Sequence, residues 1–111
     1  MIDIQISNME KATLVEVSGR IDSSNADQLG SALTGTVSNG QTQIVLDLSA
    51  VEYMSSAGLR EIVSVYRKLE AASGDLRIAQ PSVRVMDVLE MSGLDTMLQI
   101  YPTQVDALGS D

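Results

Sequence analysis

The stretch "IVLDLSAVEYMSSAGLREIV" at positions 44–63 contains the change of pattern that decides the fold. Its first part, Ile44 to Leu48, is almost continuously apolar, as in a central strand that is covered on both faces. Beyond the two serines, apolar residues recur at helical spacing, at Leu59, Ile62, Val63, Tyr66 and Leu69. A buried strand is therefore followed by an amphipathic helix, and the residues between them are expected to form a loop.

The flanking segments predict further strands and helices on both sides of this unit. Alternating apolar residues near the N-terminus are typical of a hairpin, Ser24 with Asp27 three residues later predicts a helix N-cap, and Gly93 is placed to end a helix. The expected elements are, in order, strands at 1–7 and 12–18, a helix at about 25–37, the strand at 44–48, the helix that ends by 73–75, a strand at 76–79, a helix from 81 to about 90, a strand at 97–101 and a last helical turn. This order predicts one α/β domain over residues 1–111, with parallel crossovers in its second half.

Composition excludes several classes of function. The 111 residues include 15 acidic and 7 basic side chains, for a net charge of -8, which disfavours nucleic acids and anionic membranes as partners. The chain has no Cys and no His, so disulfides, thiol catalysis and the commonest metal ligand are absent. The N-terminus does not resemble a signal peptide, and no apolar run approaches the ~20 residues of a membrane span. We expect a cytoplasmic protein.

The residues do not support an enzyme. A Ser-His-Asp triad is impossible without His, and the short glycine spacing from Gly30 to Gly35 lies in a predicted helix and not after a strand, as a phosphate-binding loop would. No cofactor or metal is predicted. Asp47 interrupts the buried strand, where it either accepts backbone N–H groups or positions the following loop, and Asp22 fits a turn or a cap.

Ser55 and Ser56 allow two interpretations. A helix that starts at Ala57 needs an N-cap, and Ser is a preferred one. A hydroxyl at a helix N-terminus is also well placed to carry a phosphate, because the helix dipole and free N–H groups stabilise an anion there. Apolar Val51, Tyr53 and Met54 in the expected loop suggest either a docking surface or side chains that close the core.

The segment at 44–63 resembles the signature of the STAS domain in anti-sigma factor antagonists, in which a strand ending in D-L-S is followed by a serine-containing turn and a G-L that opens the second helix. "VEVSGRIDSSNADQL" at 15–29 resembles the V-x-G-x-[IL]-D segment before the first helix of that family. The resemblance covers nearly the whole chain. It implies a single-domain STAS-like α/β fold, with a mixed sheet of four or five strands and three or four helices packed mainly on one side.

The resemblance also implies a partner switch. In the family, the unphosphorylated antagonist binds a serine-kinase anti-sigma factor and releases the sigma factor, the kinase uses its own ATP to phosphorylate the antagonist, and a PP2C-type phosphatase reverses this. The phosphorylated serine of the family falls on Ser56, with Ser55 as second choice because it replaces the usual Asp. Asp22 and Asp47 match acidic positions near the switch. The residues expected to contact the partner are Asp22, Ser24, Tyr53, Met54, Ser55, Ala57, Gly58, Leu59 and Arg60.

Two other classes of function remain open. A STAS subunit of a scaffold or transport complex would use the same surface for a constitutive protein contact. A small enzyme or metabolite-binding domain could hold an anion at the same helix N-terminus, but the missing His, Cys and phosphate-binding loop disfavour it.

Overall fold

A computed structural model describes residues 2–109, so Met1, which the first predicted strand included, and residues 110–111 lie outside the description. The strands are β1 (Ile2–Asn8), β2 (Thr13–Ile21), β3 (Gln43–Met54), β4 (Asp75–Ala79) and β5 (Gln99–Tyr101). The helices are α1 (Ala26–Ser38), α2 (Ser56–Ala71), α3 (Val83–Met91), the short 3-10 helix η1 (Leu94–Thr96) and α4 (Gln104–Gly109). The predicted order of elements is confirmed, including the last helical turn, which is α4.

The five strands form one mixed sheet in the order β1-β2-β3-β4-β5. β1 and β2 are an antiparallel hairpin, whereas β2, β3, β4 and β5 are parallel to one another. Helices α1, α2 and α3 make the three crossovers between the parallel strands. The hairpin and the parallel second half predicted from the sequence are both confirmed.

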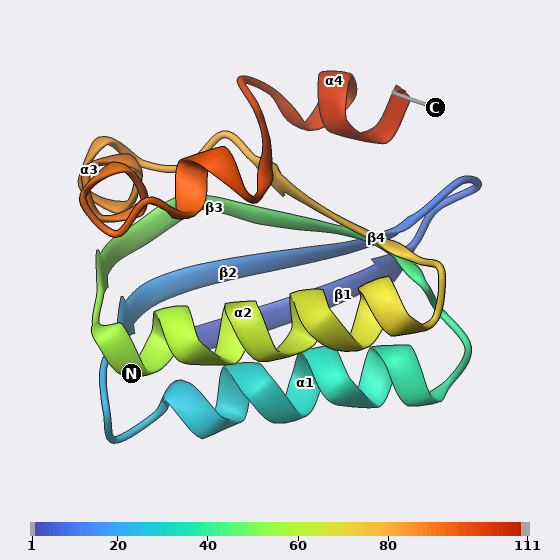
Figure 1. The fold of residues 1–111 in the computed structure, drawn as a ribbon, viewed down its shortest axis with the longest axis horizontal. Coiled ribbons are helices and arrows are strands. Elements are labelled where there is room, and N and C mark those ends of the chain that lie inside the picture. Colours follow the sequence, from blue (N-terminus) through green and yellow to red (C-terminus); the bar gives the residue numbers. More distant parts are fainter. Residues whose placement is uncertain (1, 110–111) are drawn as a thin grey trace.

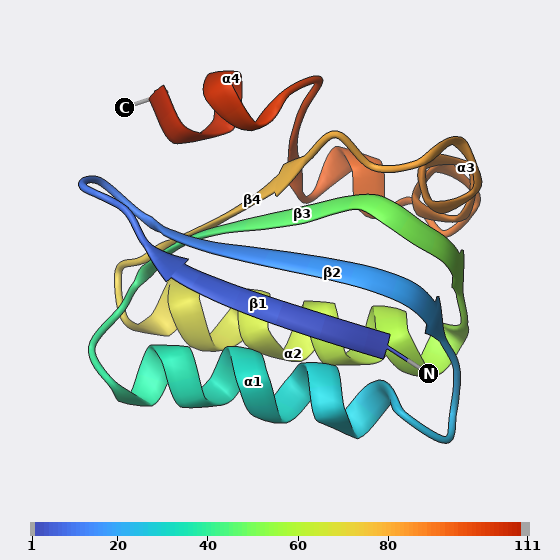
Figure 2. The same ribbon diagram turned by 180° about the vertical axis from the view of Figure 1, so that it is seen from behind.

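The two faces of the sheet are covered differently. Helices α1 and α2 lie side by side along one face, α3 lies near the bent end of β3, and α4 lies on the opposite face (Figures 1 and 2). Within residues 2–109, no helix has the length and apolar character that crossing a membrane requires.

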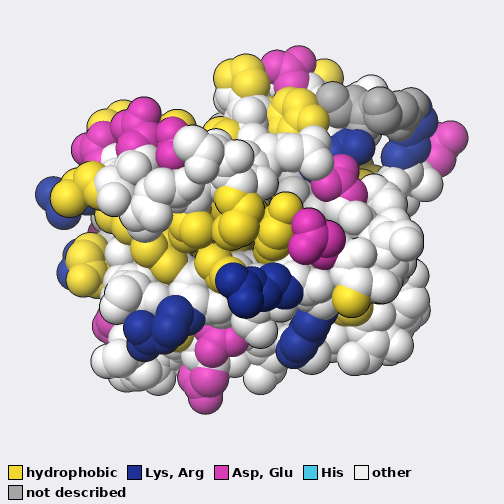
Figure 3. Space-filling view, viewed as in Figure 1, with side chains coloured by type: hydrophobic (Ala, Val, Ile, Leu, Met, Phe, Trp, Pro, Cys, Tyr) yellow, Lys and Arg dark blue, Asp and Glu magenta, His cyan; other side chains and the backbone are white. Residues whose placement is uncertain are grey.

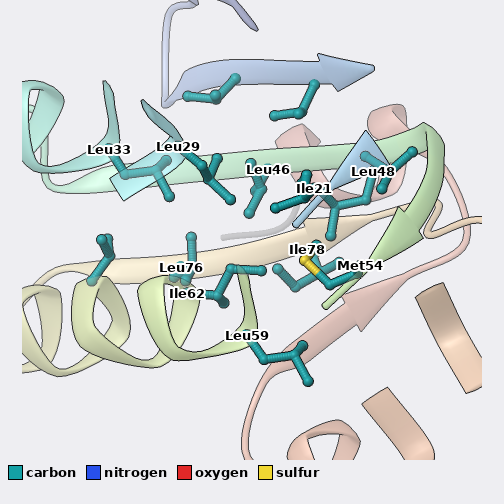
Figure 4. Close-up of a cluster of buried hydrophobic side chains, with 14 of the residues drawn as sticks. Ile21, Leu29, Leu33, Leu46, Leu48, Met54, Leu59, Ile62, Leu76 and Ile78 are labelled. Atoms are coloured by element: carbon teal, nitrogen blue, oxygen red, sulfur yellow. The ribbon is translucent and has the colours of Figure 1, made fainter. Parts of the chain in front are cut away.

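The main core lies between the sheet and the first three helices. Alternate residues of the strands point into it, among them Val15, Leu46 and Ile78. Leu46 and Ile78 lie among the same buried side chains as Leu29 of α1 and Ile62 of α2 (Figure 4). Val85 and Leu89 of α3 belong to the same cluster. A smaller cluster on the opposite face consists of Ala12, Leu14, Val45, Ala79 and Ala107. Because Val45 and Leu46 are buried on opposite faces, the prediction of a strand covered on both sides is confirmed.

The expected loop after residue 48 is wrong, because β3 continues to Met54. Val51 is 1% exposed and Met54 is 2% exposed, so neither is a surface residue and Met54 cannot offer its side chain to a partner. The added length pairs with the end of β2, where Arg20 lies opposite Tyr53 and Ile21 opposite Met54. The pairing partner lies more than thirty residues away in the sequence, so local alternation did not reveal this part of the strand.

Asp47 is a buried polar group with a full set of partners. Its carboxylate is 4% exposed and accepts the backbone N–H of Ser49 at 2.8 Å, as one interpretation of the sequence expected. It also accepts the side-chain amides of Gln80, at 3.0 Å, and Gln104. The Gln104 amide donates to Glu16 of β2 as well, so these bonds tie α4 to two neighbouring strands.

We expect Asp47→Ala to lower the free energy of unfolding by about 1–3 kcal/mol, because two amides and a backbone N–H lose a buried acceptor. Urea denaturation followed by circular dichroism measures the change. Ser49→Ala is the matched control: Ser49 is exposed and keeps its backbone N–H, so the expected change is below about 0.5 kcal/mol. Equal stability of Asp47→Ala and the unmutated protein would contradict this account of the carboxylate.

Candidate functional site

The junction between β3 and α2 is built around the hydroxyl of Ser55. Ser55 has extended backbone angles, φ -83° and ψ 170°, and its side chain accepts the N–H of Gly58 at 3.4 Å. It is therefore the N-cap of α2, which satisfies one of the free N–H groups of the first turn. A serine N-cap, as predicted, is confirmed, but it is Ser55 and the helix begins at Ser56, one residue before the predicted start at Ala57.

The two adjacent serines have different environments. Ser55 is half-buried and its hydroxyl is engaged in the cap, whereas Ser56 is exposed as the first residue of the helix. The first turn of α2 carries no acidic side chain. Ser56 therefore presents an accessible hydroxyl at a helix N-terminus, where an added anion would be stabilised.

Gly58 sets how closely α2 approaches the sheet. A Cβ atom at this position would lie 2.7 Å from Cγ2 of Ile21 and 2.5 Å from Sδ of Met54. Ile21 and Met54 are among the buried side chains of the main core (Figure 4). The absence of a side chain at Gly58 thus lets the first turn of the helix, with both serines, rest directly on the ends of β2 and β3.

The turn between β2 and α1 adjoins the serines. The N–H of Ser55 donates to the carbonyl of Ile21 at 2.9 Å, which links the start of α2 to the residue that precedes Asp22. The Asp22 carboxylate accepts two hydrogen bonds from Ser24, one from its hydroxyl at 2.5 Å and one from its backbone N–H at 2.9 Å. The hydroxyl bond is the main cause that holds the pKa of the Asp22 carboxyl below its usual value.

Ser24 is not the N-cap of α1, so that prediction is wrong. The helix begins at Ala26, and the N-cap position is taken by Asn25, which makes no side-chain capping bond. Asn25 instead accepts the N–H of Asp22 at 2.9 Å and donates to the carbonyl of Arg20 at 2.9 Å. The turn closes on Asp22 through these bonds, which draws the Ser24 hydroxyl away from the helix and confirms Asp22 as a turn residue.

Arg20 belongs to this surface although the sequence did not single it out. Its guanidinium carbon lies 4.8 Å from the ring centre of Tyr53, which is 37% exposed. The contact depends on the pairing of Arg20 with Tyr53 across two strands. A signal was present, since Arg20 and Tyr53 each lie within one of the two segments that carry the family resemblance. Their pairing could not be predicted without the extension of β3 to Met54.

The structure separates the predicted contact residues into two groups. Ser24, Tyr53, Ser56 and Arg60 are exposed, and Asp22, Ser55 and Ala57 are half-buried, so all of these line one surface around the start of α2 or the adjoining turn. Met54, Gly58 and Leu59 are buried beneath them. Asp47 lies apart, in the network that holds α4. In the part of the chain described, no group of three or more His, Cys, Asp or Glu residues is arranged to hold a metal.

Comparison with known proteins relates the chain to one family. The model of the STAS domain family matches residues 3–107. A putative anti-sigma factor antagonist, BtrV of Bordetella bronchiseptica, is 38% identical over 84 residues, which are 76% of this chain and 70% of that protein. An anti-sigma F factor antagonist of Paenibacillus polymyxa is 27% identical over 96% of this chain and 92% of its own.

A solved structure agrees over almost the whole chain. The crystal structure of an anti-sigma factor antagonist from Mycobacterium paratuberculosis superposes with a TM-score of 0.91 at 31% sequence identity. The match covers 99% of this chain and 93% of the other. The strand order, the crossovers and the position of the β3–α2 junction therefore belong to an architecture found in a known protein.

We expect Gly58→Ala to destabilise the protein by about 1–3 kcal/mol, because a methyl group at this position overlaps Ile21 and Met54. Thermal and urea denaturation measure the loss. The control is Gly35→Ala in α1, where a Cβ would meet no atom within 4 Å and where alanine should stabilise the helix by roughly 0.5–1 kcal/mol. The explanation by close contact is wrong if both variants shift stability in the same direction.

We expect Ser24→Ala to raise the pKa of Asp22 toward the usual aspartate value of about 3.9, because the hydroxyl donor is lost. The pKa of Asp22 is lower in the folded than in the unfolded chain, so its bonds stabilise the fold above about pH 4 and this contribution is lost as the pH falls through the lowered pKa. An NMR titration of the Asp22 carboxyl carbon measures the shift. Ser23→Ala, at an exposed neighbour, should leave the pKa unchanged, and an unchanged value in Ser24→Ala would refute the assignment.

Proposed function

The chain belongs to the STAS domain family, and from this membership we propose that it is an anti-sigma factor antagonist in a partner-switching pathway. Unphosphorylated, it binds a serine-kinase anti-sigma factor and so releases the sigma factor. Phosphorylation of Ser56 by that kinase weakens the complex, and a PP2C-type phosphatase restores it. Two relatives that are named anti-sigma factor antagonists, and of which this chain covers 70% and 92%, support the proposed binding to an anti-sigma factor.

The observation that carries the choice of Ser56 is the difference between the two serines. The hydroxyl of Ser55 caps α2 by accepting the N–H of Gly58. Phosphorylation of this hydroxyl would break the cap and destabilise the helix. Ser56 is exposed, and its hydroxyl makes no hydrogen bond with any residue in the range 2–109. A kinase can therefore reach Ser56 without opening the fold.

Phosphorylation at this position acts on docking and not on folding. A phosphate adds about -1.5 to -2 charge, which the N-terminus of α2 tolerates because the helix dipole and the free N–H groups favour an anion. An interface formed for a neutral hydroxyl loses packing and meets an unfavourable desolvation cost. A 100-fold switch requires about 2.7 kcal/mol, which such a change in charge can supply.

In this function the protein is a substrate and a ligand, and it catalyses no reaction itself. The ATP is bound by the partner kinase, so no cofactor is needed in this chain. The cytoplasm, where the kinase, the phosphatase and the sigma factor act, is the corresponding location.

The switch is tested by incubating the protein with its purified cognate kinase and ATP and mapping phosphate by mass spectrometry. We expect phosphate on Ser56. In binding assays Ser56→Asp should weaken the complex by about 100-fold, the scale of a loss near 2.7 kcal/mol, while Ser56→Ala should fold and bind as the unmutated protein does.

Ser55→Ala is the matched control, because it removes the neighbouring hydroxyl. We expect it to lose about 1 kcal/mol of stability with its cap but to accept phosphate as before. Phosphate on Ser55 alone would overturn the residue assignment. Stable binding with no phosphorylation at all would instead favour a constitutive STAS subunit of a scaffold or transport complex.

A further inference from the structure

A groove runs along α2 from the proposed phosphorylation site. It has a volume of about 600 Å³ and lies between α2 and the segment that follows α3. Its apolar part is formed by Leu59 and Val63 of α2 and by Leu94 of η1. In the space-filling view, hydrophobic side chains form a continuous band between these elements, with Lys and Arg side chains along the α2 side (Figure 3).

The charge of the groove is opposite to that of the protein. The chain has a net charge of -8, yet the residues that line the groove include Arg60 and Arg67 and, among the described positions, no carboxylate. Both arginines are exposed, and neither forms an ion pair within residues 2–109. Two cations beside an apolar surface fit an occupant that is apolar on one side and acidic at its edge.

The spacing of these residues suggests a helical occupant. Arg60 and Arg67 are seven residues apart on α2, which is two turns of a helix, or about 10.5 Å. The groove follows α2 from Ser56 to Arg67, which is about 16 Å or three turns. A helix lying along α2 can therefore place two of its carboxylates, also about seven residues apart, opposite the two arginines while its apolar side rests on Val63.

We propose that this groove binds an acidic amphipathic helix of the anti-sigma factor kinase, with Arg60 and Arg67 paired to its carboxylates. The proposal rests on the proposed function for the identity of the partner. It adds the surface that the partner uses beyond the phosphorylated serine and the chemistry of the segment that fills it.

The groove also gives phosphorylation a second route to weaken binding. Ser56 and Arg60 both line the groove and are four residues apart on one helix, so their side chains are neighbours. A phosphate on Ser56 can form a charge-assisted hydrogen bond with the Arg60 guanidinium. It would then compete with the carboxylate of the partner for the same arginine.

The test is titration calorimetry of the full chain with the purified anti-sigma factor kinase of the same organism, with ADP so that no phosphate is transferred. We expect Arg60→Glu and Arg67→Glu each to weaken binding by about tenfold or more, because each sets like charges against each other. Val63→Ser should also weaken it. Lys68→Glu makes the same charge change on the same helix, but Lys68 donates to Thr34 of α1 and does not line the groove, so a change below about twofold is expected.

Two further measurements test which segment of the kinase fills the groove and whether a negative charge at Ser56 competes with that segment for Arg60. Hydrogen exchange of the kinase should show protection of a helix with acidic residues about seven positions apart. Ser56→Asp combined with Arg60→Glu should weaken binding by less than the product of the two single effects, because both act on one ion pair.

The outcomes separate this proposal from the proposed function. If Arg60→Glu and Arg67→Glu bind as the unmutated protein does while Ser56→Asp still weakens binding, the groove is not the docking surface and the switch stands. If Lys68→Glu weakens binding as much as the arginine variants, or if no helix of the kinase with acidic residues about seven positions apart is protected, the proposal is overturned. If the unmutated protein does not bind the kinase, both proposals fail.

Discussion

The parallel pairing of β2 with β3, continued to Ile21 and Met54, is the constraint on which the rest of the structure depends. It buries the end of β3 and, through the bond from the Ser55 N–H to the carbonyl of Ile21, it positions the start of α2 beside the turn at Asp22. Gly58 then allows the helix to rest on these two strand ends. The exposed hydroxyl of Ser56 is consequently positioned by the ends of two paired strands and the first turn of a helix.

The face of the sheet that α4 covers is stabilised in a different way. There the small apolar cluster is supplemented by Asp47, whose carboxylate accepts hydrogen bonds from Ser49, Gln80 and Gln104. Because Gln104 donates to both Asp47 and Glu16, polar bonds and not a large apolar area hold α4 in place. Helix α4 thus packs on the smaller cluster, on the face of the sheet opposite α1 and α2.

Much of the fold was predictable because its signals are local. Strand alternation, helical spacing and the preference for a serine cap before α2 act over a few residues, and each matches the structure to within a residue or two. The predictions were wrong where contacts with residues distant in the sequence determine the local structure. The segment up to Met54 is a strand only because β2 lies beside it, and Ser24 turns toward Asp22 because Asn25 bonds to Arg20 and to Asp22.

The sequence by itself determined the order of elements, the serine pair at the end of the central strand and the family resemblance, because these depend on residue type and spacing along the chain. Only the tertiary structure decided which serine is engaged and which is exposed, that Met54 is buried, and that Arg60 and Arg67 face an apolar groove. Burial and complementarity are properties of surfaces brought together from distant segments, and a linear pattern does not contain them.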